Sequence, residues 1–277
     1  MHIYRKNILL LPEEFFVVLF TEGWRYFMRD IEDYVSKYSS EPFEEYMVKI
    51  RKKMVLEQCN KYEHANILEI GCALNPLFLD FDDYKNMVIV EPGVEFVENA
   101  KMLAGMQVDK NIKIIKGFFE EQVPYIKNLG MDFDIIILSS VLHEINNPQA
   151  MLSAIYSVCS SKTIIHINVP NAKSLHRIMA KEMGIVSDIY EQSEQMKKMQ
   201  RSRTYDIDSL VEEINTSGFV DIDSGSYFVK PFTHSQLQRC LDLGIVDESY
   251  IVGLEKLINY LPEYGAGIYV NCKKGEV

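Results

Sequence analysis

The sequence predicts an α/β fold with a mostly parallel sheet, and three observations lead to this prediction. From Asn66 onwards, short apolar runs alternate with segments of helical pattern, which is typical of βαβ units with helices on both faces of a sheet. The first five runs are apolar throughout, as in parallel strands that are buried on both faces. Two later runs alternate more between polar and apolar residues, which favours an antiparallel edge.

Seven segments are expected to be strands, because each is a short run of apolar or alternating residues. They are residues 67–70, 87–90, 112–115, 133–138, 163–169, 219–229 and 265–272. Helices are expected between them at residues 93–106, 119–128, 148–160 and 206–217. Asn147-Pro148 is a start signal for the third of these helices, and Gly218 is a stop signal for the fourth.

The chain before the first strand is expected to form a helical cap. Residues 1–62 are rich in aromatic and charged residues and contain no clear strand. Apolar residues recur there at helical spacing in residues 15–20, 31–38 and 46–59. The sequence therefore predicts an N-terminal helical cap of residues 1–62, followed by a main domain of residues 63–277.

The main domain is expected to carry two helical insertions, at about residues 171–205 and 233–260. Both regions are more polar than the apolar runs around them and lack a strand pattern. We expect the insertions and the cap to fold over the site as a lid, which would exclude water from it.

Composition argues against several classes of function. The formal net charge of −11 disfavours binding to a phosphate backbone. Five cysteines form no Cys-x-x-Cys pair, so neither structural disulfides nor a cysteine zinc site is expected, which fits a reducing compartment. The apolar run at residues 8–11 ends at Pro12, and no stretch approaches the ~18 apolar residues that span a bilayer. A cytoplasmic protein without a membrane or nucleic-acid partner is expected.

The segment 66–76, read together with Glu91, is the most informative in the chain. An apolar run ends at Glu69 and Gly71, and about twenty residues later a second run ends in Glu91, as at a nucleotide-type site between parallel strands. A dinucleotide site has three glycines in this turn, whereas this turn has one, and no Walker lysine and hydroxyl follow it. The turn therefore disfavours a pyrophosphate, and Glu69 suits a cationic or amine-bearing ligand.

Three motifs in this order resemble those of class I S-adenosylmethionine-dependent methyltransferases. The segment 69–73 (Glu-Ile-Gly-Cys-Ala) is similar to the first motif of that family, and Glu91 is similar to its acid at the end of the second strand. The segment 133–140 is similar to the fourth-strand motif. Ala73 and Asn75 stand where the second and third glycines of the first motif usually lie.

The resemblance covers residues 60–170 well and implies a Rossmann-like class I methyltransferase fold, which has a seven-stranded, mostly parallel sheet with an antiparallel edge. It also implies S-adenosyl-L-methionine as the cofactor and S-adenosyl-L-homocysteine as the product. Glu91 would bind the ribose hydroxyls, and the segment 116–120 would deliver residues to the adenine. The residues implied to contact the cofactor are Glu69, Gly71, Cys72, Ala73, Glu91, Pro92, Gly117, Phe118, Phe119, Ser139 and Ser140.

His143 is the residue expected to carry out proton transfer. Methyl transfer from a sulfonium to a hydroxyl requires alignment of the nucleophile and removal of its proton. The segment 138–145 would face the methyl group, and the ordinary pKa of histidine lies near neutrality. Two alternatives remain open at this point. His143 can instead pack against the cofactor, or it can bind a metal together with Glu144 and His166; no metal is expected.

The run 166–177, which contains Val-Pro-Asn-Ala-Lys-Ser-Leu-His-Arg, is similar to a bacterial subgroup of these enzymes that modifies small molecules or sugars. An Arg-x-Tyr element follows in that subgroup and reads Arg203-Thr-Tyr205 here. Two arginines would suit a phosphate or carboxylate on the acceptor, but His176 and Arg177 can equally tether the insertion. The residues expected on the acceptor side are His166, Asn171, His176, Arg177, Arg203 and Tyr205.

The expected function is S-adenosylmethionine-dependent methylation of a small molecule, sugar-linked or anionic, on an oxygen with His143 as general base. The chain lacks the Asn/Asp-Pro-Pro-Tyr and Pro-Cys motifs of methyltransferases that act on nucleic-acid bases. The alternatives are N- or C-methylation, which the same scaffold supports, and a catalytically idle cofactor-binding partner that regulates an assembly. Association into a homodimer is left open.

Overall fold

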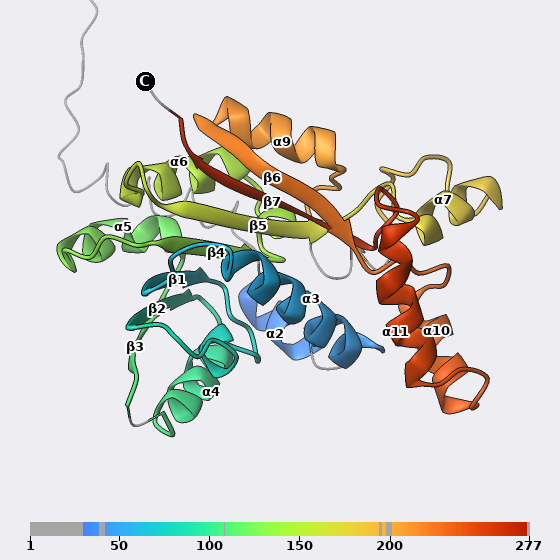
Figure 1. Cartoon of the computed structure of the whole chain (residues 1–277), viewed down its shortest axis with the longest axis horizontal. Helices are drawn as coiled ribbons and strands as arrows, with labels where there is room; N and C mark the ends of the chain where they lie inside the picture. The colour runs from blue at the N-terminus through green and yellow to red at the C-terminus, as the bar shows by residue number, and fades with distance from the viewer. Residues whose placement is uncertain (1–29, 39–41, 108, 194–195, 198–200, 276–277) are drawn as a thin grey trace, which may run out of the picture.

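The computed structural model describes residues 30–38, 42–107, 109–193, 196–197 and 201–275. They form a seven-stranded sheet of order β3-β2-β1-β4-β5-β7-β6, whose strands follow one another in Figure 1 from β6 at the top to β3 at the lower left. The strands are β1 (Asn66–Ile70), β2 (Asn86–Glu91), β3 (Asn111–Lys116), β4 (Ile135–Ser139), β5 (Ile164–Pro170), β6 (Phe219–Tyr227) and β7 (Gly267–Lys274).

The predicted fold class is confirmed. The strands β1 to β5 pair in parallel, and β7 pairs antiparallel with both β5 and β6. Each expected strand is present within a few residues of its predicted bounds. The prediction that all five early strands are buried on both faces is wrong for β3, which alternates between exposed and partly buried residues. It forms the edge of the sheet, where the flanking helices cover it only in part.

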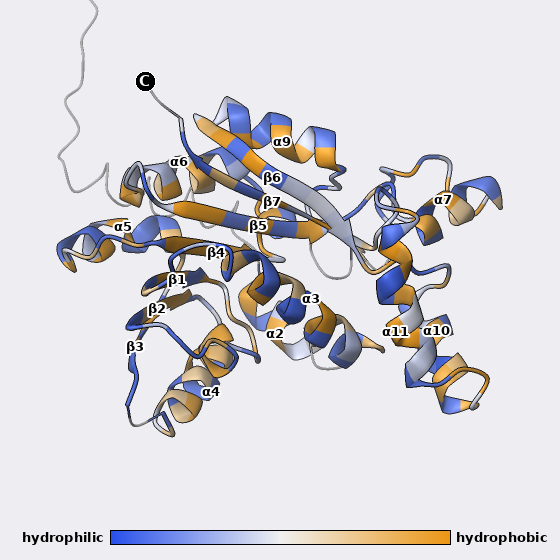
Figure 2. Ribbon diagram, in the orientation of Figure 1, coloured by the Kyte–Doolittle hydropathy of each residue, from blue (hydrophilic) through white to orange (hydrophobic). Residues whose placement is uncertain are grey.

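Helices cover both faces of the sheet. The helices after the first strands are α4 (Val94–Ala104), α5 (Phe119–Asn128), α6 (Pro148–Val158) and α9 (Ile207–Thr216). Side chains of the central strands point alternately to the two faces: Leu68 and Leu138 join a core with α5, α6 and α9, whereas Ile67 and Ile137 join a second core. Figure 2 shows the hydrophobic residues concentrated along β1 and β4 between these layers.

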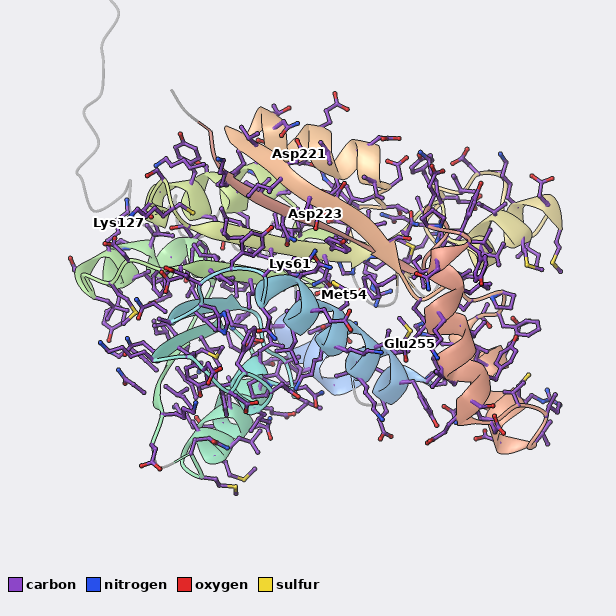
Figure 3. The ribbon with its side chains drawn as sticks, in the orientation of Figure 1. Met54, Lys61, Lys127, Asp221, Asp223 and Glu255 are labelled. Carbon is purple, nitrogen blue, oxygen red and sulfur yellow. The ribbon has the colours of Figure 1, made fainter. Side chains whose placement is uncertain are left out.

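The helices expected in the cap are α2 (Ile31–Tyr38) and α3 (Glu44–Cys59). Helix α3 belongs to the second core, where Met54 and Val55 are buried. Two ion pairs add contacts beside it: Lys61 binds Asp223 of β6 at 2.9 Å, and both residues are labelled in Figure 3. Lys53 of α3 binds Glu255 at 2.6 Å. Surface pairs contribute little, so burial holds α3 against the sheet. The domain boundary at residue 62 stays a prediction, and the aromatic repeat at 15–20 lies outside the described residues.

The second insertion contains α10 (His234–Asp242) and α11 (Glu248–Lys256), as expected. The first insertion is less helical than predicted: α7 (Leu175–Glu182) is followed by turns over residues 183–193. Gly184 has a positive φ of 71°, which ends the helix in the usual left-handed conformation. In Figure 1 α7, α10 and α11 lie together at one end of the sheet. In the described part of the chain, no helix is both long enough and apolar enough to cross a bilayer.

The side chain of Asp206 bonds both to α9 and to residues of the first insertion, so we expect its removal to destabilise both. Its carboxylate caps α9 through Ser209 N (2.9 Å), pairs with Lys173 Nζ (2.7 Å) and accepts from Tyr190 Oη (2.8 Å). Burial opposes ionisation of Asp206, but the hydrogen bonds from Lys173, Ser209 and Tyr190 outweigh it and hold the pKa well below its ordinary value. Asp206→Ala should lower the free energy of unfolding by about 2 kcal/mol, measured by urea denaturation at neutral pH.

The matched control is Asp208→Ala, because Asp208 is the other carboxylate on Lys173 and its side chain is 85% exposed. It should change stability by less than ~0.5 kcal/mol. Since the folded pKa of Asp206 is depressed, its contribution is present above the unfolded pKa of about 4 and is lost as the pH falls below it. Equal losses in the two variants would contradict this role of Asp206.

Candidate functional site

A cavity opens at the carboxyl ends of the parallel strands. Its volume is 2060 Å³, about twice the upper end of the roughly 300–1,000 Å³ range of small-molecule pockets. It extends from the ends of β1 and β2 past the end of β4 to the segments that follow β5 and β6. The cavity is therefore large enough for two ligands side by side.

Most of the residues predicted from the sequence line this cavity. They are Glu69, Gly71, Cys72, Ala73, Glu91, Pro92, Phe118, Phe119, Ser139, Ser140, His143, Asn171, His176, Arg177 and Arg203. Three predicted residues are not among its lining residues: Gly117, His166 and Tyr205. Gly117 has a φ of 143° and lies at the turn between β3 and α5, where a Cβ would meet Gln122.

Glu91 fixes the turn that follows β1. Its Oε2 accepts hydrogen bonds from the backbone N–H groups of Cys72 (3.0 Å) and Ala73 (3.2 Å), and its Oε1 accepts one from Gly93 (2.8 Å). The residue is only 4% exposed. Burial raises its pKa and these three amides oppose the rise. Glu91 thus holds together the two turns that border this end of the cavity.

Glu69 is a second buried carboxylate at the same end. Its Oε2 accepts a hydrogen bond from Leu77 N at 3.1 Å, which closes the loop after Gly71. Burial raises the pKa of Glu69 to about 8, although the Leu77 amide and the charge of Lys52 act against this. A cationic group brought close to Glu69 would favour its ionised form. We refer to Glu69 and Glu91 as the acidic end of the cavity.

The turn between them has left-handed backbone at two positions. Gly71 has a φ of 76°, and its N–H donates to Val90 O at 2.9 Å. Ala73 has a φ of 47°, so it adopts a conformation that usually falls to glycine, at a cost of roughly 1 kcal/mol. Ala73 therefore adopts the left-handed backbone conformation of the glycine that usually stands at this position of the motif, and the shape of the turn is kept.

Gly71→Ala is expected to destabilise the protein by about 3 kcal/mol and to weaken cofactor binding, because a side chain there meets two obstacles. The backbone is left-handed, and a Cβ would lie 2.8 Å from Val141 Cγ2. Gly130→Ala is the matched control: Gly130 has a φ of 59°, but nothing lies within 4 Å of its Cβ position. The control should cost only about 1 kcal/mol in urea denaturation. Equal costs would show that Val141 does not restrict the turn.

The acidic end fits the cofactor that the motifs imply. Glu91 Oε1 accepts only one hydrogen bond from the described residues, so it retains a lone pair for a ribose hydroxyl. Glu69 faces the same cavity and suits an amine or a sulfonium. Pro92, Phe96 and Phe118 supply apolar surface beside them for a purine ring. No pyrophosphate would be attracted to two buried carboxylates.

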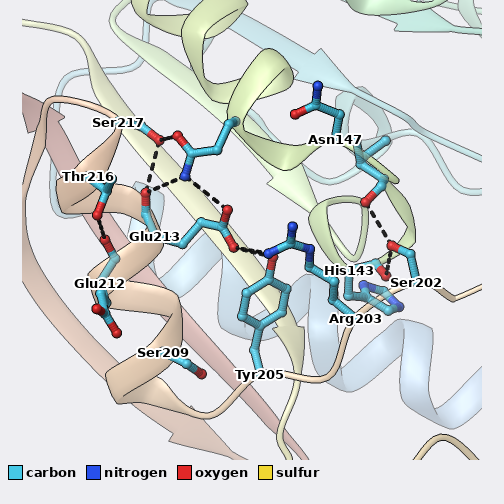
Figure 4. Close-up of polar contacts among 12 residues, drawn as sticks. His143, Asn147, Ser202, Arg203, Tyr205, Ser209, Glu212, Glu213, Thr216 and Ser217 are labelled. Atoms are coloured by element: carbon cyan, nitrogen blue, oxygen red, sulfur yellow. Dashed lines mark hydrogen bonds and ion pairs between the residues drawn. The ribbon is translucent and has the colours of Figure 1, made fainter. Parts of the chain in front are cut away.

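His143 lies in the middle of the cavity wall, in the short 3₁₀ turn Leu142–Glu144 after β4. It is buried, and its Nε2 is 3.8 Å from Glu144 Oε1. Its backbone carbonyl accepts from Ser202 N (3.0 Å) and Arg203 N (3.1 Å), and Figure 4 shows Ser202 beside it. The first insertion therefore anchors the backbone of His143.

The two predicted acceptor-side arginines are engaged by neighbouring segments. Arg177 donates to the carbonyls of Ile189 (2.8 Å) and Glu191 (2.6 Å). Arg203 Nη1 pairs with Glu213 Oε2 at 2.9 Å, and Tyr205 donates to the same oxygen at 2.9 Å (Figure 4). The contacts of Arg177 favour the alternative in which it tethers the insertion, and Arg203 is engaged by α9 in a way that the sequence did not predict.

His166 lies inside β5, where neighbouring strands enclose it. Asn168 Nδ2 donates to its Nε2 (3.1 Å), so its Nδ1 carries the proton and donates to Asn271 Oδ1 (2.8 Å). Burial lowers its pKa to about 4. The metal alternative would need His166 beside His143 and Glu144, and the described residues contain no group of three or more metal-ligating side chains. Asn171 also lines the cavity, but its amide donates to Glu263 O and Gly265 O.

A set of basic side chains at the other end of the cavity was not predicted from the sequence. Lys230, His234 and Arg201 line it beside His176. One local signal was available: Lys230 is a lone charge between Phe228-Val229 and Pro231-Phe232. Such a lysine is more often buried than one in a polar run.

Comparisons with known proteins show the family and the fold of the chain. A family model described as a methyltransferase domain matches residues 27–224, which is well over half of the chain. No curated protein matches the chain. A solved S-adenosylmethionine-dependent methyltransferase from Thermotoga maritima, described as a possible histamine N-methyltransferase, has a TM-score of 0.56 at 14% identity and covers 91% of this chain and 99% of its own.

Two further solved structures have the same fold. A methyltransferase from Archaeoglobus fulgidus has a TM-score of 0.50 at 17% identity, with 83% of this chain and 98% of that chain covered. The 1,6-didemethyltoxoflavin-N1-methyltransferase of Burkholderia thailandensis, solved with bound 1,6-didemethyltoxoflavin and S-adenosylhomocysteine, has a TM-score of 0.50 at 12% identity. It covers 98% of this chain and 94% of its own.

Proposed function

This chain belongs to the methyltransferase-domain family and is an S-adenosylmethionine-dependent enzyme, and from this premise we propose that it O-methylates a small, anionic or sugar-linked molecule. The observation that carries the proposal is the single cavity of 2060 Å³, which has the cofactor residues at one end and His143 at its middle. That volume leaves space for an acceptor of small-molecule size next to the cofactor.

The residues of the acidic end hold and orient the methyl donor. Glu91 would bind the ribose hydroxyls of the donor while its hydrogen bonds to the backbone keep the turn in shape, and Glu69 would suit the amine-bearing part. When bound, the donor supplies an electrophilic methyl group on a sulfonium. The surrounding apolar side chains keep water from that group.

The role of His143 in this proposal is to accept the proton of an acceptor hydroxyl. It follows β4 and lies in the strand order between Glu69, at the end of β1, and His176, which follows β5. A general base has to be held in position between donor and acceptor. Hydrogen bonds to its carbonyl hold the His143 backbone there. A nitrogen that is already neutral has a free lone pair and needs no base before transfer, so loss of turnover in a His143 variant distinguishes hydroxyl methylation from methylation of a neutral nitrogen.

Calorimetry with S-adenosylhomocysteine, and with NAD⁺ as the control ligand, tests the cofactor assignment. We expect a Kd in the micromolar range for the first and no binding of the second, because two buried carboxylates oppose a pyrophosphate. Labelled methyl transfer into extracts of the source cell, fractionated by size, then tests the acceptor class. Label in protein or nucleic acid alone would overturn the small-molecule proposal, and no label in any fraction would favour the idle binding partner.

A further inference from the structure

The basic side chains opposite the acidic end come from two separate segments of the chain, one after β5 and one after β6. His176 is in the first turn of α7, and Lys230 follows β6. His234 is the first residue of α10, and Arg201 lies in the first insertion. All four line the cavity, and we refer to them as the basic wall.

Lys230 is the most deeply buried member of the basic wall. The residue is 2% exposed, and the one hydrogen bond of its ammonium group among the described residues goes to Phe232 O at 3.1 Å. No carboxylate of the described residues lies within ion-pair distance of it. Burial lowers its pKa to about 7. Lysine is rarely buried without a partner, so a charge at this position needs compensation from another source.

Two further members of the basic wall, His176 and Arg201, have buried nitrogen atoms without a partner in the described part of the chain. His176 Nδ1 and Arg201 Nε are buried, and neither has a hydrogen-bond partner among the described residues. Burial lowers the pKa of His234 to about 3, and the charges of Lys230 and Arg201 add to this effect. Burial also lowers the pKa of His176, followed by the charges of Lys230 and His234. Both histidines thus lie within reach of the charge of Lys230, and His234 also lies within reach of that of Arg201.

The sheet places the basic wall away from the acidic end. Glu91 ends β2 and His176 follows β5, and three strand spacings of roughly 5 Å separate those strands. The end of β6 also lies at this edge, because Tyr227 and Pro170 both pair with Gly267. A cationic ligand is favoured at one end of the cavity and an anionic one at the other.

A buried hydrogen-bond donor without a partner lowers the stability of a folded protein, unless a bound ligand supplies the missing acceptor. Several cationic or neutral nitrogen donors directed into one cavity match the oxygens of a carboxylate or a phosphate. The two arginines predicted from the sequence do not serve this purpose, because their guanidinium groups bind carbonyls and Glu213. We propose that the basic wall of His176, Lys230, His234 and Arg201 binds a carboxylate or phosphate group of the methyl acceptor. This inference rests on the proposed function, since it assigns the acceptor's charge.

Calorimetry on the S-adenosylhomocysteine complex in low-chloride buffer tests the basic wall, with inorganic phosphate and acetate as separate probes. We expect saturable binding of at least one anion, and the one that binds identifies the chemistry of the acceptor group. Lys230→Met should weaken that binding by 10-fold or more. The variant should still fold, because it replaces a buried unpaired charge with an apolar side chain of similar length.

Lys127→Met is the matched control, since Lys127 lies on α5 at the end of the molecule opposite Glu255 and α11 (Figure 3). It should leave anion binding unchanged, and neither variant should alter the affinity for S-adenosylhomocysteine. His234→Phe is a second variant, and it should also lower the affinity for the anion. If neither anion bound, or if wild type and Lys230→Met bound the anion equally, the proposed anion-binding role of the basic wall would be wrong. The cofactor assignment would be unaffected. Failure to bind S-adenosylhomocysteine would instead reject the proposed function.

Discussion

Glu91→Gln is expected to weaken S-adenosylhomocysteine binding by about 100-fold or more, because one carboxylate holds three backbone amides and a glutamine holds fewer. In either orientation, the glutamine NH₂ group would face an N–H donor: Gly93 on one side, or Cys72 and Ala73 on the other. The two turns would lose their common anchor, and the ribose would lose an acceptor. The free energy of unfolding should also fall by about 1–3 kcal/mol.

The control for this variant is Glu98→Gln on α4. Glu98 is exposed, and its one ion pair within the described part of the chain is with Lys101, three residues away. It should leave both the affinity and the stability nearly unchanged. Calorimetry measures the affinity and urea denaturation measures the stability. If Glu91→Gln lost stability but kept its affinity, Glu91 would shape the turn without contacting the cofactor.

His143→Ala is expected to reduce methyl transfer by about 10²- to 10⁴-fold while leaving the affinity for S-adenosylhomocysteine unchanged. A general base acts in the transition state, so its removal lowers kcat with little effect on cofactor binding. The measurement pairs single-turnover transfer of a labelled methyl group with calorimetry on the same preparation.

The control is His64→Ala, because His64 packs against Phe81 outside the cavity. It should retain full turnover. Unchanged turnover in His143→Ala would assign His143 to packing and would favour methylation of a nitrogen. Parallel losses of turnover and cofactor affinity would mean that His143 supports the cofactor instead of moving a proton.

The sheet and the acidic end could be predicted from the sequence because their signals are local. The run before Glu69 and the run before Glu91 are apolar and short, and a carboxylate after each marks a strand end. The departure at Ala73 could be read from the motif, but its left-handed backbone could not, since alanine rarely adopts it.

The acceptor side was harder to predict because its contacts join distant segments. The pairing of Arg203 with Glu213 depends on the position of α9, and the enclosure of His166 depends on Asn271, more than a hundred residues away. Lys230 is brought to the cavity by the antiparallel pairing of β6 with β7, which no motif records. The resemblance to the bacterial subgroup suggested that Arg177 and Arg203 bind an anionic acceptor. In the structure, Arg177 donates to backbone carbonyls and Arg203 pairs with Glu213.

The two ends of the cavity come from different parts of the chain, and this separation has a consequence for specificity. The acidic end is built on β1 and β2 in the sheet core, whereas His176, Lys230 and His234 lie on segments appended after β5 and β6. Substitutions in those appended segments can change which molecules are accepted without disturbing the donor site. The protein is in this sense modular, and its acceptor range is the property most open to evolution and to redesign.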